Sequence, residues 1–252
     1  MNTRLLFAAT LLGIAGAAAA ENVSQYVEPR IGTAHCRWFH IAPGALPFGM
    51  AKPGPSTNGH LGNEQGWEAS GYDYRESSIE GFPCIHEFQL GGISLMPTKG
   101  ALVTVPGEVD NTEGHGYRSF FDREAEQAHP GYYSVLLKRY GILAELTATE
   151  RTAYERFTFP AGDDNHILFD IGNRQGESGA VADARVELRF DGSVEGYVVT
   201  LPEYVKKYQA GAEVPIYFSA VVDRRPAAFG TFNGEKTTPG ASVAEGPGAG
   251  LY

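Results

Sequence analysis

Glycine and proline recur along this chain at short intervals, and this feature limits what the chain can fold into. The sequence holds 32 Gly and 15 Pro in 252 residues, about 19% of the chain, where average proteins have roughly 12%. Both residues disfavour helix interiors, glycine through its backbone entropy and proline through its missing N–H group. We therefore expect short strands joined by turns, with short helical turns only at 122–127 and 202–207.

Alternation of apolar and polar residues supports this expectation. It is clearest at 142–150, where Ile142, Ala144 and Leu146 alternate with polar or acidic residues, as in a half-buried strand. A turn at 191–192 is expected to join two strands in a hairpin. The segments with strand character are 132–140, 166–171, 186–190, 194–200 and 216–222. The predicted fold class is all-β, an antiparallel β-sandwich.

The end of the sequence differs from the rest. Residues 232–250 show little periodicity, and the chain then stops at Leu251 and Tyr252, which look like the start of another strand. A folded domain rarely stops at such a point. We therefore expect the last strands of the sandwich to be missing and the chain to be a C-terminally truncated piece of a longer protein.

The charge balance excludes some classes of partner. Lys and Arg number 20 against 30 Asp and Glu, which gives a formal net charge of −10. Nucleic-acid binding and docking on anionic lipid both depend on clustered cations. We expect neither a nucleic-acid partner nor a membrane partner for this chain.

The first 20 residues have the layout of a secretory signal peptide. Arg4 provides the positive start, residues 5–15 form an apolar run too short to span a bilayer, and 18–20 are three alanines suited to cleavage. A membrane anchor is disfavoured because the run is short and no stop-transfer pattern follows. We expect residues 21–252 to be the mature domain, exported to the periplasm or the extracellular space.

Export would permit a disulfide, and the sequence offers one possible pair. Cys36 and Cys84 are its two cysteines. An oxidising compartment favours their pairing, but the sequence does not give their distance. A disulfide and two unpaired thiols in loops both stay open as hypotheses.

A series of Gly-, Pro- and aromatic-rich motifs follows in a fixed order. They lie at 31–33 (IGT), 42–50 (APGALPFGM), 66–74 (GWEASGYDY), 79–82 (IEGF) and 95–98 (LMPT), with further matches at 131–135, 145–151, 157–160 and 195–197. Their order and spacing resemble the N-terminal domain of glycoside hydrolase family 92, the calcium-dependent exo-acting α-mannosidases. The resemblance covers nearly all of the mature chain. Where many members carry a His-rich segment after the IxGF turn, this chain keeps one histidine, His86.

The resemblance implies a larger enzyme of two domains. An N-terminal β-sandwich would pack on an (α/α)₆ barrel, which supplies the acid, the base and most calcium ligands of an inverting hydrolysis of α-mannosides. Inversion requires two carboxyl groups separated widely enough to admit water. In the family these groups lie beyond the end of this chain. We therefore expect no catalytic residue and no metal ligand here, calcium only in the intact enzyme, and no hydrolysis by this chain alone.

Five residues are candidates for substrate binding. In the family the segment with Trp67 faces the cleft shared with the barrel, and a loop tryptophan suits stacking on a sugar. His86 and Glu87 are a second candidate pair, and His35 and Arg37 a third. The structural alternatives are a tryptophan at the domain interface, a histidine satisfied by backbone groups beside a solvated glutamate, and a salt-bridging arginine.

An acidic stretch also invites a catalytic interpretation. Glu68, Asp73, Glu76 and Glu80 lie close together in sequence. Nothing fixes the separation that paired carboxyl groups require, and calcium needs six to eight oxygen ligands. We interpret this stretch as a solvated acidic loop.

Two other functions compete with that of a mannosidase domain. The chain alone is a candidate mannan-binding or glycan-binding module without catalysis, because open sandwich faces with aromatic residues can hold sugars. It is also a candidate structural fragment that only buries a face of a partner. A large exposed apolar patch would indicate the structural fragment.

Overall fold

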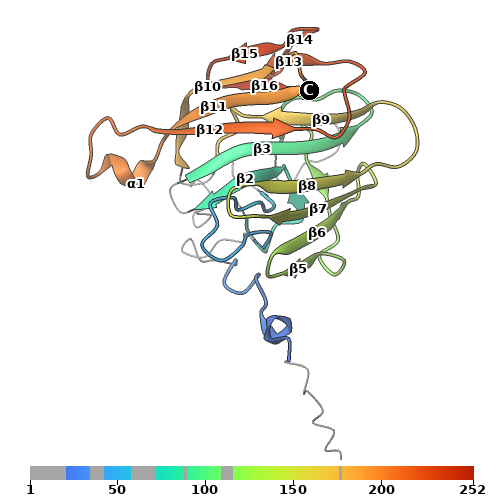
Figure 1. Ribbon diagram of the computed structural model, residues 1–252, viewed down its shortest axis with the longest axis vertical. Helices are drawn as coiled ribbons and strands as arrows, with labels where there is room; N and C mark the ends of the chain where they lie inside the picture. The colour runs from blue at the N-terminus through green and yellow to red at the C-terminus, as the bar shows by residue number, and fades with distance from the viewer. Residues whose placement is uncertain (1–20, 35–42, 58–71, 88–89, 109–115, 176–177) are drawn as a thin grey trace, which may run out of the picture.

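A computed structural model describes residues 21–34, 43–57, 72–87, 90–108, 116–175 and 178–252 (Figure 1). Within these ranges the protein is built almost entirely of antiparallel strands, which confirms the predicted all-β class. A 3₁₀ turn at Val23–Tyr26 and one short helix, α1 (Glu203–Lys206), are the helical elements there. His35, Arg37, Cys36, Trp67 and Glu68 lie outside the described residues.

Three main sheets are stacked in layers (Figure 1). The outer sheet has the strand order β12 (Val214–Val221), β11 (Ser193–Leu201), β10 (Ala180–Leu188) and β15 (Val243–Glu245). The central sheet has the order β14 (Lys236–Pro239), β13 (Gly230–Asn233), β16 (Ala249–Leu251), β9 (Asn165–Asp170), β3 (Leu90–Lys99) and β2 (Phe82–Glu87). The lower sheet has the order β5 (Gln127–His129), β6 (Tyr132–Leu137), β7 (Ile142–Ala148) and β8 (Ala153–Thr158). A small ribbon pairs β1 (Ser78–Ile79) with β4 (Ser119–Phe120).

The central sheet is apolar on both faces, because a hydrophobic core lies on each side of it. Met96 of β3 and Leu168 of β9 are cross-strand partners and belong to the core shared with the lower sheet. The next pair, Leu95 and Phe169, belongs to the core shared with the outer sheet. Successive side chains of a strand point to opposite faces, so one pair of strands serves two cores. This explains why β9 reads as a continuous apolar run in the sequence.

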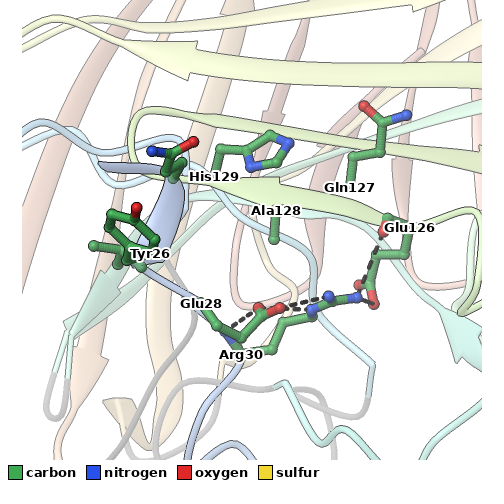
Figure 2. Close-up of a pocket in the computed structure, with 9 residues that line it drawn as sticks. Tyr26, Glu28, Arg30, Glu126, Gln127, Ala128 and His129 are labelled. Carbon is green, nitrogen blue, oxygen red and sulfur yellow. Dashed lines mark hydrogen bonds and ion pairs between the residues drawn. The ribbon is translucent and has the colours of Figure 1, made fainter. Parts of the chain in front are cut away.

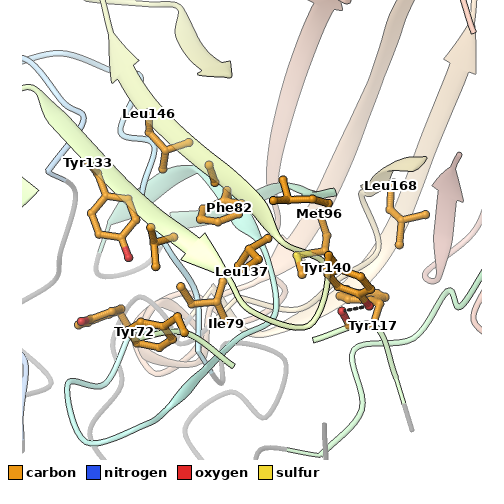
Figure 3. Close-up of a cluster of buried hydrophobic side chains, with 14 of the residues drawn as sticks. Tyr72, Ile79, Phe82, Met96, Tyr117, Tyr133, Leu137, Tyr140, Leu146 and Leu168 are labelled. Carbon is orange, nitrogen blue, oxygen red and sulfur yellow. Dashed lines mark hydrogen bonds between the residues drawn. The ribbon is translucent and has the colours of Figure 1, made fainter. Parts of the chain in front are cut away.

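The core between the central and lower sheets is rich in aromatic residues (Figure 3). Tyr117, Tyr133 and Phe82 are fully buried within it. The hydroxyl of Tyr140 donates to the carbonyl oxygen of Tyr117 over 2.7 Å, so the polar end of this ring is satisfied inside the core.

Most predicted strands are confirmed, and the segment at 232–250 corrects the sequence interpretation. It contains parts of four short strands, β13 to β16, of three or four residues each. Leu251 does not start a new strand. It is the last residue of β16, which lies between β13 and β9 in the central sheet. Gly250 faces the ring of Phe232, and a Cβ there would lie 2.0 Å from Phe232 Cζ. Glycine therefore serves close packing here, which a periodicity argument does not detect.

The two predicted helical turns have different outcomes. The segment at 202–207 contains α1, as expected. The segment at 122–127 is a turn, closed by a hydrogen bond of 3.1 Å from Ala125 N–H to the Asp122 carbonyl oxygen, and β5 begins at its last residue.

Candidate functional site

The two ends of the segment that contains Trp67 meet at one buried point. Thr57 precedes this segment, and Tyr72 and Asp73 follow it. The Asp73 N–H group donates to Thr57 Oγ1 over 2.9 Å, and all three residues are buried. The residues on the two sides of 58–71 are thus joined to each other inside the protein.

A fully buried arginine stabilises this contact. Arg118 donates from Nε to Ser78 Oγ over 3.0 Å and from its terminal nitrogen to the carbonyl oxygen of Thr57. It also forms an ion pair of 3.8 Å with Glu80, which accepts a hydrogen bond from Ser56 Oγ over 2.9 Å. Buried charges are costly unless they are paired and hydrogen-bonded, and here both conditions are met.

This network corrects the interpretation of the acidic stretch as a solvated loop. Glu80 has no exposed surface, and Asp73 is 2% exposed and paired with Arg75, whose Nε lies 2.9 Å from Asp73 Oδ1. The sequence interpretation was wrong for Glu80 because its cation, Arg118, comes from a distant segment, and for Asp73 because its backbone is bonded to the buried Thr57. Both carboxyl groups serve structure, bound to arginines of this chain.

A second buried carboxylate, that of Glu126, accepts hydrogen bonds from several side chains near Tyr72. Glu126 accepts hydrogen bonds from the hydroxyl groups of Tyr72 over 3.0 Å and Tyr133 over 2.7 Å. Arg123 adds an ion pair of 3.3 Å and lies over the ring of Tyr74, 4.2 Å from its centroid. Burial, followed by the charge of Glu126, raises the pKa of both Tyr72 and Tyr133 well above the ordinary value, so both stay donors. Tyr72 belongs to the core, whereas Tyr74 is exposed.

A polar pocket of about 250 Å³ opens beside Glu126 (Figure 2). It lies between the segment after the 3₁₀ turn and strand β5, and it is lined by Gln25, Tyr26, Val27, Glu28, Arg30, Glu126, Gln127, Ala128 and His129. Arg30 lies 2.7 Å from Glu28 and 3.6 Å from Glu126, and the hydrogen bonds from Arg30 lower the pKa of Glu28 to about 2. Together with Arg123, which pairs with Glu126, Arg30 balances the two carboxylates, and its contacts hold the N-terminal segment against the start of β5.

His86 is a buried histidine whose ring nitrogens face backbone carbonyl groups, which is the structural alternative to a role in substrate binding. Its ring is buried on β2, with Nδ1 3.1 Å from the carbonyl oxygen of Lys52 and Nε2 3.2 Å from that of Pro55. It ties β2 to the segment at 50–57, whose Lys52 N–H group also donates to the Cys84 carbonyl oxygen over 2.8 Å. Glu87 ends β2 and pairs in register with Leu90.

Cys84 is a free thiol in the structure. Its Sγ donates to Glu155 Oε1 of β8 over 3.4 Å, between the central and lower sheets. Burial raises the pKa of the thiol well above its ordinary value and raises the pKa of Glu155 to about 8. Because Cys36 lies outside the described residues, its state stays open as before.

Two chemical features are lacking in the described part of the chain. No group of three or more His, Cys, Asp or Glu side chains comes together there as a metal site would require, so the calcium ion that the resemblance implies has no such ligand set among these residues. None of the helices described there has the length and apolar character to cross a bilayer.

The buried network escaped the sequence analysis almost completely. Arg118 and Glu126 belong to no motif, and arginine and glutamate are rarely buried unless paired. Their partners lie far away in the sequence, 61 residues in the case of Arg118 and Thr57 and 54 in the case of Glu126 and Tyr72. A weak signal exists in Tyr133, which lies in the 131–135 motif of the resemblance.

Comparisons with known proteins agree with this architecture. A family model of the glycosyl hydrolase family 92 N-terminal domain matches residues 26–252. An uncharacterized secreted glycosidase of Arthroderma benhamiae is 33% identical over 147 residues, which are 55% of this chain and 18% of that protein.

Solved structures give the same result. A family 92 α-mannosidase of Bacteroides thetaiotaomicron, solved in complex with mannoimidazole, is 26% identical with a TM-score of 0.79 over 92% of this chain. An inverting family 92 mannosidase of the same organism shares the fold, with a TM-score of 0.70, 21% identity and the same 92% coverage. The chain spans 30% of the first structure and 29% of the second. The chain belongs to glycosyl hydrolase family 92, as an N-terminal domain of that family.

Proposed function

We propose that this chain is the N-terminal domain of an exported α-mannosidase and that it supports a catalytic domain outside the 252 residues. The observation that carries the proposal is the family match over 26–252, together with the likeness to an α-mannosidase that binds mannoimidazole. Secretion of the Arthroderma benhamiae relative and the signal-like residues 1–20 support export.

The buried contacts of Thr57 and Asp73, on the two sides of residues 58–71, suggest how the domain contributes to sugar binding. Thr57 is bonded to Arg118 and to Asp73, so the residues that flank this segment are held by hydrogen bonds. Rigid supports place binding groups more accurately than free loops do. In this proposal Trp67 stacks on a mannose ring at the edge of the cleft shared with the barrel.

The other candidates take different roles. His35 and Arg37 would contact hydroxyl groups of the same substrate, and Glu87 would lie at the cleft end of β2. His86 would act on the site through the backbone that it holds, since its ring nitrogens lie against two carbonyl oxygens. The acid, the base and the calcium ligands would come from the (α/α)₆ barrel.

Two protein forms test this function. One is the chain of 252 residues, and the other is the product of the reading frame followed beyond Tyr252. We expect the longer form to release mannose from an α-linked mannobiose in a calcium-dependent way, and the chain alone to release none. Calcium-dependent release of mannose by the chain alone would contradict the proposal, as would a longer form without activity on any α-mannoside.

The contribution of Trp67 is tested in the longer form. Trp67→Ala is expected to raise KM about tenfold or more, because an aromatic stacking surface is lost. Tyr154→Ala serves as a matched control, since Tyr154 is an exposed ring on β8 with 56% of its surface accessible. Equal kinetics for Trp67→Ala and the unaltered enzyme would remove Trp67 from the site.

A further inference from the structure

The open face of the outer sheet carries four side chains in one row. Tyr217 of β12 pairs in register with Tyr197 of β11, Tyr197 with Arg185 of β10, and Arg185 with Glu245 of β15. All four point away from the core, because their neighbours Ala184, Val186, Val198 and Ala244 are buried against the central sheet. Adjacent strands lie about 4.8 Å apart, so the row extends roughly 14 Å across the sheet.

Of the two aromatic residues in the row, Tyr217 is exposed and Tyr197 is half-buried. Tyr217 has 75% of its surface accessible, and its ring centroid lies 5.9 Å from that of Tyr197 at an angle of 53°. The Tyr197 hydroxyl donates to Asp183 Oδ2 over 2.9 Å, which fixes the orientation of this ring. Two neighbouring rings of this kind present apolar surface beside polar groups.

The polar half of the row is a set of linked charges. Arg185 lies 2.8 Å from Glu187 and 3.0 Å from Glu245, and Arg189 lies 3.2 Å from Glu187 and 3.9 Å from Glu195. With Asp183, the face carries four carboxylates and two arginines, so a polyanion would be repelled. The centres of protein interfaces are depleted of charged residues. These features favour a small neutral polar ligand over a protein or a nucleic acid.

We propose that this face binds a neutral oligosaccharide, with sugar rings stacked on Tyr217 and Tyr197 and hydroxyl groups bonded to Arg185, Glu245 and Asp183. Pyranose rings combine apolar faces with polar edges, which matches a row that is aromatic at one end and ionic at the other. The choice of α-mannan as the sugar rests on the proposed function. The row shares no residue with the Trp67 segment, so it adds a second contact with a long glycan.

The test measures binding of the purified chain to soluble α-mannan by affinity electrophoresis and to linear α-mannotriose by calorimetry. Dextran tests sugar specificity, and polygalacturonate tests the expected exclusion of polyanions. The variants are Tyr217→Ala, Tyr217→Phe and the double variant Tyr197→Ala/Tyr217→Ala, with Tyr154→Ala as the control on the lower sheet. Circular dichroism establishes that each variant is folded, and Tyr217→Ala alone decides the result if the double variant does not fold.

We expect Tyr217→Ala to weaken mannan binding about tenfold, the double variant to lose it, and Tyr217→Phe and Tyr154→Ala to bind like the unaltered chain. Equal binding by the unaltered chain and Tyr217→Ala, or no binding by the unaltered chain, would overturn the inference. Self-association that Tyr217→Ala abolishes in sedimentation velocity, without mannan binding, would overturn it by assigning the face to a second copy. Hydrolysis by the longer protein is measured separately, so the proposed function stands or fails independently.

Discussion

The buried Glu155 carboxyl group makes the stability of this domain depend on pH near neutrality. Its side chain points from β8 toward Cys84 on β2, between the lower and central sheets. Oε2 has neither solvent contact nor a hydrogen-bond partner, so the ionised form is poorly satisfied in the folded chain. Burial accordingly raises the pKa of Glu155 from 4.5 to about 8. Folding thus favours the protonated acid.

The sign and size of the effect follow from this difference between the folded and unfolded pKa. Because the folded pKa is raised, the stabilisation is complete below about pH 4.5 and is lost progressively as the pH rises through about 8. Between pH 5.5 and 8.5 the loss from Glu155 alone is roughly 3 kcal/mol. This value is an upper bound, because part of the residue is accessible to water and water lowers the cost of the charge.

The assay compares urea unfolding of the unaltered chain and Glu155→Gln at pH 5.5 and 8.5. We expect the two proteins to differ by about 1 kcal/mol or less at pH 5.5, and the variant to be more stable by about 2–3 kcal/mol at pH 8.5. The raised pKa of the Cys84 thiol adds no slope in this window, because the ordinary thiol value of 9.0 already lies above it. Comparing the two proteins at each pH cancels the contributions of the other titrating groups.

Glu145→Gln is the matched control on the neighbouring strand. Glu145 is bonded to Arg156 and Tyr132 on the open face of the lower sheet, and these hydrogen bonds lower its pKa. Its contribution to stability is therefore lost only in acid. The free energy of unfolding of Glu145→Gln should change between pH 5.5 and 8.5 by the same amount as that of the unaltered chain. A Glu155→Gln variant that also keeps the slope of the unaltered chain would refute the reasoning.

Two further substitutions test the packing described above. Arg118→Met should destabilise the chain by about 3–5 kcal/mol in urea unfolding, because Glu80 stays buried without its cation, and adding Glu80→Gln should recover part of this loss. If Arg118→Met were as stable as the unaltered chain, the ion pair with Glu80 would not contribute to stability. Gly250→Ala should lower the melting temperature by several degrees, because its Cβ would overlap the ring of Phe232, and Phe232→Leu should relieve the effect. Equal melting of Gly250→Ala and the unaltered chain would refute the close contact.

Alternation of apolar and polar residues predicts well the strands that border a single core. In β7 the alternation of Ile142, Ala144 and Leu146 with polar residues is reproduced in the structure as alternating burial. Such a pattern arises locally, from residues two positions apart, and needs no knowledge of the partner strand. The strands at 232–250 lack it because three or four residues are too few to establish a period.

The candidate site was less predictable, for a different reason. The burial of Glu80 depends on Arg118, and that of Glu126 on Tyr72 and Tyr133, and none of these partners is recognisable before the fold is known. A sequence gives the residue types that are able to pair, but the folded chain determines which ones meet. The motifs of the resemblance therefore indicated the family, whereas the buried contacts of Thr57, Asp73 and Arg118 became visible only in the structure.

The position of β16 also affects how this domain folds during synthesis. Residues 249–251 lie between β9 and β13, so a ribosome must add them before the two parts of the central sheet can join. Until then β9 presents an open edge of unpaired backbone groups to other nascent chains. At about 5–20 residues per second, the interval between completing β9 and adding β16 lasts roughly 4–16 s. The central layer therefore cannot close before residues 249–251 have been made.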